Sequence, residues 1–463
     1  MIVHDLTAAL GESAVSTDPD DLMDHAQDWW VLGMLRKRRG DELTLPECVV
    51  RPQTVGQVAA VLEVATAHGV PVVPFGGGSG VCGAAQAVAG AVVLDTRRFD
   101  RIVIDEQALT VRTGAGVIGS ELETVLNESG LTLGHFPQSI AISTVGGWLA
   151  TRSAGQKSNR YGRIDEMVIG LVVVLPDGSV IELPARPATS AGPDLTRLFL
   201  GSEGTLGVMT EATLRVRPAP SHHLSAGFRF DSFVSGLRAL QALSRAGLAP
   251  AVTRLYDETD AWMSFRDHAP GGAPLIVRLE GDDVLSAESD ALDSAVAAAG
   301  GALLGPTLAD RWWEHRNDAV GTIRQVIFDG LLGPTAVADT MEVAVTWPVD
   351  ELYHSVRDAL SQQADLVGCH ASHVDRQGAC LYFTFAMTGS PDDSAVEERY
   401  LAAWQAGMEA TVDVGGTITH HHGVGLLRTP WIDAELGTGA KLLRLVKQAL
   451  DPSGIMNPGK LIG

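Results

Sequence analysis

The chain has 463 residues and carries 34 basic against 56 acidic side chains, so its formal net charge at pH 7 is −22. A chain this negative is repelled by nucleic acid and by anionic membranes unless it has a strong basic patch, and its densest basic run is Arg36-Lys37-Arg38-Arg39. No stretch approaches the ~20 apolar residues that span a bilayer. We therefore expect no nucleic-acid partner and no membrane insertion. The length exceeds the roughly 250–300 residues at which single cores stop growing, which predicts two domains.

The cysteines predict no disulfide framework and no metal site. There are four of them, too scattered for a CxxC pair, at Cys48, Cys82, Cys369 and Cys380. The N-terminus lacks the basic and apolar regions of a signal peptide. We therefore expect a cytoplasmic protein with a small-molecule substrate, and we leave a homodimer open.

The first half of the chain predicts an N-terminal helical extension over 1–45, followed by a first domain over 46–218. Apolar residues recur at helical spacing from Val55 to Ala65. Further elements follow in chain order: a strand over 70–73, a glycine-rich turn over 74–80, strands over 91–95, 101–104 and 109–111, a helix over 118–126, a hairpin over 167–175 and 180–183, and a strand over 207–217. Pro218 and Pro220 mark the domain boundary.

The second domain, over 219–463, is predicted to be α+β. Its helical patterns cover 233–246, 287–299 and 349–363, and its strand patterns cover 274–279, 341–346 and 379–386. We find no internal repeat and no low-complexity segment.

Three glycine-rich segments are candidates for binding chemistry. The first is Pro74, Phe75, Gly76, Gly77, Gly78, Ser79 and Gly80. A glycine loop lets backbone N–H groups converge on an anion such as a pyrophosphate, although a simple tight turn is the alternative. Its spacing matches neither the Walker loop nor the G-x-G-x-x-G fingerprint.

The other two segments are also rich in small and hydroxyl-bearing residues. Such residues suit a backbone packed against a flat cofactor, and a close helix–helix contact is the alternative. The second segment contributes Pro137, Gln138, Ser139, Ser143, Thr144, Gly146, Gly147, Ala150, Thr151 and Ser153, and the third contributes Glu203, Gly204, Thr205, Gly207 and Val208.

The order and spacing of these segments, with Asn159-Arg160-Tyr161-Gly162 between them, resemble the FAD-binding domain of the vanillyl-alcohol-oxidase-type flavoproteins. The resemblance covers the chain from about residue 46 to its end. It implies an FAD domain followed by a cap domain that supplies the substrate site, with FAD held by the residues named above. Members with covalent FAD carry a histidine where this chain has Ser79, so we expect non-covalent FAD; Cys82 is either an alternative attachment point or a buried thiol.

Within that family, Thr419-His420-His421-His422-Gly423 and the ending Asn457-Pro458-Gly459-Lys460 resemble the alkyldihydroxyacetone-phosphate synthase branch. The resemblance implies that Tyr382 is the catalytic acid or base beside flavin N5, that Arg254 supports the site, and that His420, His421 and His422 take part. Imidazoles can exchange protons, donate to phosphate or bind metal. If this segment were extended, however, only His420 and His422 would share a face, and a purely structural role for the histidines stays open.

One departure from the synthase branch and a comparison with a second branch leave alternatives open. Phe328-Asp329 stands where the synthases have Arg-Asp, and only Arg324, one helical turn earlier, could replace that cation. The D-2-hydroxyacid dehydrogenases bind a metal through two motifs, whose counterparts here begin at His373 and His421 and lack a histidine and a glutamate, so we predict no metal. The resemblance thus implies an FAD-dependent oxidoreductase-like enzyme of the synthase type, which activates a C–H bond next to an oxygen-bearing carbon at flavin N5. An oxidase or dehydrogenase of a 2-hydroxy acid or of another hydroxylated metabolite, and a flavin-binding protein without turnover, are the alternatives.

Overall fold

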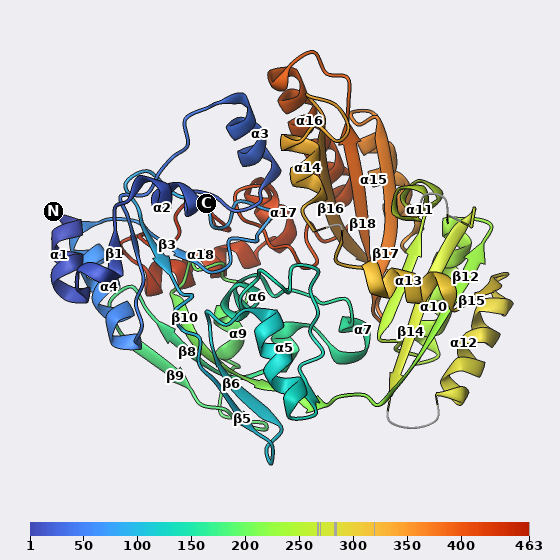
Figure 1. Ribbon diagram of the computed structural model, residues 1–463, viewed down its shortest axis with the longest axis horizontal. Coiled ribbons are helices and arrows are strands. Elements are labelled where there is room, and N and C mark those ends of the chain that lie inside the picture. Colours follow the sequence, from blue (N-terminus) through green and yellow to red (C-terminus); the bar gives the residue numbers. More distant parts are fainter. Residues whose placement is uncertain (266–267, 269, 282–284, 319, 463) are drawn as a thin grey trace.

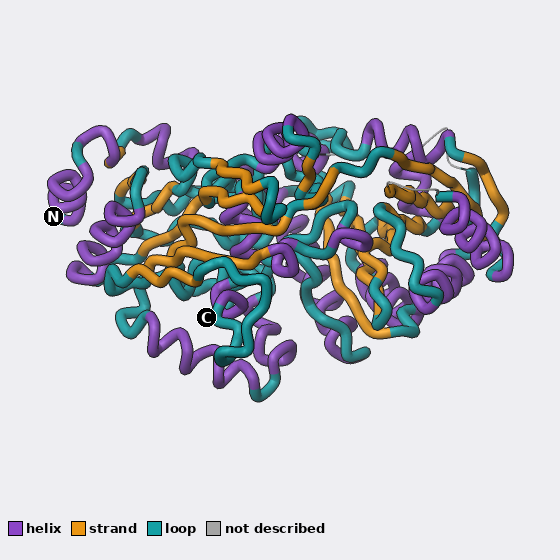
Figure 2. The backbone as a smooth tube through the Cα atoms, turned by 90° about the horizontal axis from the view of Figure 1, so that it is seen from below, coloured by secondary structure: helices purple, strands orange, loops and turns teal. Residues whose placement is uncertain are grey.

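The computed structural model describes residues 1–265, 268, 270–281, 285–318 and 320–462. Two lobes lie side by side along the long axis of the molecule (Figures 1 and 2). Residues of the first half of the chain build one lobe and most residues after 220 build the other, which we call the cap. Among the described residues, no helix is long and apolar enough to cross a membrane.

The N-terminal lobe contains two main sheets within residues 1–218, all of which the structure describes. One sheet has the strand order β1-β2-β4-β3, with β4 parallel to both β2 and β3, and the other has the antiparallel order β5-β6-β10-β8-β9. The strands are β1 (Val15–Ser16), β2 (Cys48–Val50), β3 (Val72–Phe75), β4 (Val92–Asp95), β5 (Ile102–Asp105), β6 (Thr110–Gly114), β7 (Leu131–Thr132), β8 (Val168–Val174), β9 (Val180–Leu183), β10 (Val208–Arg215) and β11 (Arg217–Pro218).

The helices of this lobe begin and end where local chemistry favours it. The side chain of Thr54 accepts a hydrogen bond from the Gln57 N–H at the start of α4, and Gly69 ends the helix in the left-handed conformation. The helices are α1 (Ile2–Leu10), α2 (Pro19–Asp24), α3 (Val31–Arg39), α4 (Val55–His68), α5 (Gly119–Glu128), α6 (Val145–Thr151), α7 (Ser158–Tyr161), α8 (Ile164–Met167) and α9 (Thr196–Phe199).

The described residues of the cap form one antiparallel sheet with the order β15-β12-β14-β13-β17-β18-β16. Its strands are β12 (His222–Phe230), β13 (Val252–Tyr256), β14 (Ala273–Gly281), β15 (Ala302–Gly305), β16 (Val337–Thr346), β17 (Leu366–Val374) and β18 (Gly378–Met387). The helices are α10 (Phe233–Arg245), α11 (Glu258–Phe265), α12 (Ser286–Ala298), α13 (Thr307–His315), α14 (Thr322–Phe328), α15 (Asp350–Ser361) and α16 (Asp393–Asp413). The last two helices of the chain are α17 (Ile432–Leu436) and α18 (Gly439–Leu450), and α18 packs against the core of the first lobe.

Residues at both ends of the chain contact lobes other than the ones to which the predicted domain bounds assign them. In the N-terminal segment, β1 pairs with β2 of the first lobe, whereas Arg38 of α3 bonds to Asp393 of the cap helix α16 with an N–O distance of 2.6 Å. At the C-terminus, Met456 forms a β-bridge with Val72 of the first lobe. Figure 1 shows α18 beside the N-terminal lobe and α3 beside α14 and α16. The segment 1–45 therefore connects the two lobes, and the segment 451–462 returns the chain to the first lobe.

Candidate active site

Among the described residues, one cavity is lined by the predicted cofactor loops on one side and by cap residues on the other. The predicted residues that line it are Pro74, Phe75, Gly76, Gly77, Gly78, Ser79, Gly80, Pro137, Gln138, Ser139, Ser143, Thr144, Gly146, Gly147, Ala150, Thr151, Ser153, Glu203, Gly204, Gly207, Val208, Arg254, Tyr382, His421 and His422. Segments as far apart in the sequence as Pro74 and His422 thus meet at one place.

Two predicted residues do not line the cavity. The hydroxyl of Thr205 is turned inward and donates to the backbone oxygen of Ser202 at 2.7 Å. The ring of His420 stacks on His373 at a centroid distance of 5.1 Å, and its Nδ1 lies 3.1 Å from Nδ1 of His421. Both residues therefore support neighbours that line the cavity instead of lining it themselves.

The sequence interpretation missed several residues of the cavity wall. Asp28 and Trp29 come from the N-terminal segment, and Gln156 follows α6. The cap adds Val320, Gly321, Ile323, Thr340, Ser372 and His373. Of these, only His373 carried a signal in the sequence, where it begins the counterpart of a metal-binding motif. In the structure it has φ +51° and lies at a bulge in β17.

Gly76 and Gly77 of the glycine loop have no room for a side chain, because this part of the loop packs directly on the loop before α6. A Cβ added to Gly77 would lie 2.0 Å from the backbone oxygen of Ile142, and one added to Gly76 would lie 2.4 Å from Oγ1 of Thr144. Gly78 has φ +61°, a conformation that glycine adopts at little cost. This tight pairing of two loops leaves backbone groups, not side chains, along this part of the cavity wall, as a pyrophosphate would require.

Cys82 follows this loop but does not reach the cavity. Its side chain is buried, and its sulfur lies 3.6 Å from Nη1 of Arg428. Burial raises the pKa of the Cys82 thiol, which disfavours the reactive thiolate. These surroundings support the interpretation of Cys82 as a buried thiol.

Strand register places the cap's polar side chains together. In β18, Tyr382 lies directly opposite Glu342 of β16 and His370 of β17, so the three side chains share one face of the sheet. The Tyr382 hydroxyl donates to Oγ1 of Thr340 at 3.0 Å, and its ring stacks on His370 at 4.8 Å. Burial raises the pKa of Tyr382, so its phenol stays protonated at neutral pH and is a proton donor.

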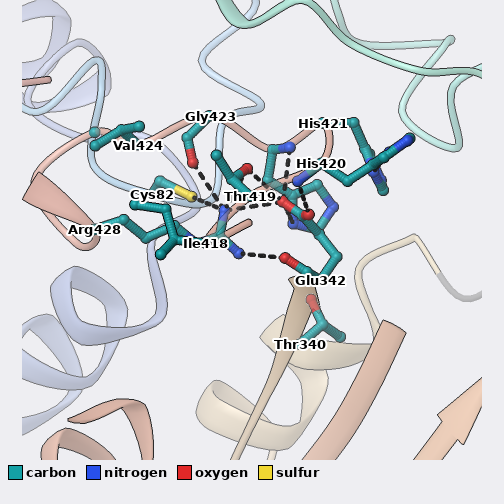
Figure 3. Close-up of polar contacts among 12 residues, drawn as sticks. Cys82, Thr340, Glu342, Ile418, Thr419, His420, His421, Gly423, Val424 and Arg428 are labelled. Atoms are coloured by element: carbon teal, nitrogen blue, oxygen red, sulfur yellow. Dashed lines mark hydrogen bonds and ion pairs between the residues drawn. The ribbon is translucent and has the colours of Figure 1, made fainter. Parts of the chain in front are cut away.

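Glu342 organises the loop that carries the three histidines (Figure 3). Its Oε1 accepts hydrogen bonds from the Thr419 hydroxyl at 2.8 Å and from the His422 backbone N–H at 2.9 Å, and its Oε2 accepts one from the His420 backbone N–H. Nη1 of Arg428 lies 2.9 Å from Oε1, and both side chains of this ion pair are fully buried. Burial alone would raise the pKa of Glu342, but Arg428 and the neighbouring donors hold it at about 2.

A second buried carboxylate, Glu203 of the first lobe, holds the next residues of the same loop. Its two oxygens accept hydrogen bonds from the backbone N–H groups of Val424 at 2.5 Å and Gly425 at 2.8 Å. The loop after Ile418 is therefore held between a carboxylate of the cap and one of the N-terminal lobe. This loop is not a strand, so the expectation that only His420 and His422 would share a face does not apply.

The histidines of this loop are neutral at physiological pH. Burial lowers the pKa of His420 and His422 to about 4, and burial together with the charges of its neighbours lowers that of His421 well below its usual range. The pKa of His373 falls for the same reasons. Because His421 and His422 line the cavity with neutral imidazole rings, they can accept a proton there.

The cation expected at the substrate end is Arg254, which lines the cavity with its guanidinium over the Trp312 ring at 5.1 Å. No carboxylate of the described residues forms an ion pair with it. Arg324 does not line the cavity; its guanidinium lies over the ring of Trp29 at 5.1 Å and over that of Phe328 at 5.7 Å. The ring of Trp29, which lines the cavity, thus contacts Arg324, and the Arg324 guanidinium does not take the place of the arginine that the synthase branch has where this chain has Phe328.

Cys380, His420 and His421 place one donor atom each within 4.8 Å of one another, close enough to hold a metal ion. Burial raises the pKa of the Cys380 thiol well above its ordinary value, so the neutral thiol is favoured there. The absence of a metal stays a prediction.

Comparison with known proteins identifies the family. Residues 46–184 match the model of the FAD binding domain, and residues 219–461 match that of the C-terminal domain of FAD linked oxidases. Alkyldihydroxyacetonephosphate synthase of Trypanosoma brucei brucei is 31% identical to this chain over 99% of it and 80% of the relative. The glycolate oxidase subunit GlcD of Bacillus subtilis is 28% identical over 90% of this chain and 89% of the relative.

A solved structure of an alkyldihydroxyacetonephosphate synthase superposes with a TM-score of 0.83 at 27% identity, covering 99% of this chain and 86% of that one. These matches confirm the predicted two-domain α+β flavoprotein fold. The chain therefore belongs to the FAD-linked oxidase family of vanillyl-alcohol-oxidase-type flavoproteins, with FAD as its cofactor, and is an FAD-dependent oxidoreductase-type enzyme.

Proposed function

We propose that the protein is an alkyldihydroxyacetone-phosphate-synthase-like enzyme that activates a C–H bond next to an oxygen-bearing carbon of a small molecule. In this proposal FAD lies non-covalently in the cavity. The loops over 74–80, 137–147, 150–153 and 203–208 would hold it, and when bound it supplies the acceptor for the electron pair of that C–H bond. The fit of FAD to the cavity rests on the glycine loop. A Cβ added to Gly77 would lie 2.0 Å from the Ile142 oxygen, so this part of the wall presents backbone groups.

The observation that carries the proposal is the pairing of a proton donor with proton acceptors on the wall facing those loops. The Tyr382 phenol is protonated, whereas His421 and His422 are neutral, and all three line the same cavity. In our proposal a histidine takes the proton and Tyr382 returns one, with Thr340 at 3.0 Å orienting the phenol. Arg254 supplies positive charge to an anionic substrate group such as a phosphate.

Oxidation of a 2-hydroxy acid is the second candidate, and Phe328 favours it. This side chain is 40% exposed and stands where the synthases have an arginine, while Arg324 is stacked behind Trp29. Arg254 alone matches the single negative charge of a hydroxy acid better than the two charges of a phosphate monoester. The similarity to the glycolate oxidase subunit GlcD is consistent with this candidate.

Anaerobic mixing with candidate substrates separates these functions. Under the synthase proposal, an acylated ketone phosphate and a labelled alcohol exchange acyl for alcohol with no net loss of flavin absorbance. Bleaching of the flavin by D-2-hydroxy acids without exchange would replace the synthase proposal with the oxidase one. Absence of both reactions with FAD-loaded protein would support a flavin-binding protein without turnover. The cytoplasmic location and the homodimer stay predictions.

A further inference from the structure

Glu203 lies in the third glycine-rich segment, and its backbone is fixed on two sides. Its N–H donates to the Ala150 oxygen at 3.0 Å, and its own backbone oxygen accepts a hydrogen bond from Nδ2 of Asn457 at 2.7 Å. Its φ of +50° is uncommon for a residue with a side chain, and such a conformation is kept only where the surroundings determine it. Glu203 is therefore anchored to α6, whose Ala150 lines the cavity.

The carboxylate of Glu203 holds the residues directly after the three histidines, in the loop that we call the histidine loop. Its two oxygens accept the backbone N–H groups of Val424 at 2.5 Å and of Gly425 at 2.8 Å. A Cβ added to Gly423 would lie 2.6 Å from Oε1 of Glu203, so the histidine loop lies in direct contact with this carboxylate. One residue thus joins the proposed cofactor loops to the loop whose histidines line the cavity.

Both hydrogen bonds require the ionised carboxylate. An ionised carboxylate accepts at both oxygens, whereas protonation turns one oxygen into a donor that would face an N–H group. Burial raises the pKa of Glu203 to about 7, although the two N–H groups lower it. Of the charged groups around it, Arg428 lowers this pKa and Asp28 raises it, and the thiol of Cys82 also interacts with the carboxylate. Glu203 therefore changes charge near neutral pH, far above the pKa of about 4 of His422.

We propose that Glu203 is a positioning residue for proton transfer, whose ionised carboxylate holds His421 and His422 in place at the cavity, an inference that rests on the proposed role of these histidines. Protonation of Glu203 releases one of the two N–H groups, so the histidines lose their fixed position while they remain neutral. Because the pKa of Glu203 is about 7 and that of His422 is about 4, turnover should decrease at a higher pH than titration of the histidines would cause.

The first test measures hydrogen exchange of backbone amides in full-length, FAD-loaded protein. In Glu203→Gln an NH₂ group faces one of the two N–H groups, so the amides of Val424 and Gly425 should exchange about tenfold or more faster than in the wild type. The amides that Glu342 holds should change less. The wild type alone gives a second measurement: after correction for the intrinsic effect of pH, the Val424 and Gly425 amides should be less protected at pH 6 than at pH 8.

The second test compares pH profiles of turnover in FAD-loaded protein. Glu203→Gln should lower turnover at least about tenfold at pH 8 and lose most of the decrease between pH 8 and pH 6. Asp28→Asn should keep that decrease with a midpoint at lower pH, because the charge of Asp28 raises the pKa of Glu203. The matched control is Glu123→Gln, since Glu123 is also buried and accepts the N–H groups of Leu133 at 3.0 Å and Gly134 at 3.2 Å. The control should keep the wild-type pH profile.

Equal exchange of the Val424 and Gly425 amides in the wild type and in Glu203→Gln would overturn the inference, and so would an unchanged pH profile of that variant. If Glu203→Gln does not fold, equal protection of these amides at pH 6 and pH 8 in the wild type would overturn it. If no candidate substrate is turned over while the exchange results are as expected, the proposed function fails, whereas the hold of Glu203 on the histidine loop is confirmed.

Discussion

Replacing Glu342 with glutamine should destabilise the protein far more than the loss of an exposed ion pair does. Glu342 and Arg428 are both fully buried at 2.9 Å, so the substitution leaves a guanidinium in the interior without a counter-charge. Breaking a buried pair in this way costs about 3–5 kcal/mol. The pKa of Glu342 gives a consistent figure, because its fall from 4.5 to about 2 corresponds to about 3 kcal/mol at roughly 1.4 kcal/mol per tenfold change in proton affinity.

The same pKa fixes the sign of the pH dependence. Because the folded-state pKa lies below the ordinary value, the stabilising contribution of Glu342 is present above about pH 4.5 and is lost as the pH falls towards 2. The Glu342→Gln variant lacks this contribution at every pH. Its stability should therefore approach that of the wild type in acid.

The assay is urea unfolding of the FAD-loaded protein, followed by tryptophan fluorescence at pH 7 and pH 4. The matched control is Glu211→Gln, whose partner Arg112 has a side chain that is 60% exposed, so its loss should cost about 1 kcal/mol or less. If Glu342→Gln lowers the free energy of unfolding by no more than the control does, Glu342 does not have the stabilising role described above.

Three further outcomes are expected. Tyr382→Phe should lower turnover at least about 100-fold while leaving FAD absorbance and affinity unchanged, and unchanged turnover would exclude Tyr382 as the proton donor. Gly77→Ala should abolish FAD uptake because its Cβ meets a backbone oxygen at 2.0 Å, whereas Gly56→Ala in α4, with nothing within 4 Å, should keep FAD and gain about 0.5–1 kcal/mol of stability. Because the pKa of His422 is about 4 against an ordinary 6.5, the melting temperature should fall as the pH drops from about 6.5 to 4, and His422→Asn should flatten that decline.

Local patterns in the sequence were sufficient to single out the glycine-rich loops that line the cavity. The glycine loop over 74–80 and the small residues of 143–153 have conformational requirements that only a few residue types meet, so they are recognisable without partners. The helix expected over 55–65 is α4, and the strand expected over 379–386 is β18, because apolar periodicity and burial agree there.

Long-range pairing accounts for what the sequence could not predict. Glu342 appears as one residue of an apolar strand, and its role depends on Thr419, His420 and Arg428, at least 77 residues away. Trp29 belongs to the segment over 1–45 that is predicted to be a helical extension, whereas in the structure it lines the cavity under Arg324 of the cap. No local signal marks such residues, since their partners are decided only when the two lobes meet.

The most direct test of the proposed function is an exchange experiment with purified FAD-loaded protein under anaerobic conditions. The account predicts that an acylated ketone phosphate, incubated with an isotopically labelled long-chain alcohol, incorporates the label and releases its acyl chain as a carboxylate, with flavin absorbance restored at the end. The Tyr382→Phe protein should show no incorporation. Wild-type protein that incorporates no label, but loses its flavin absorbance when a D-2-hydroxy acid is added, would contradict the synthase-like function.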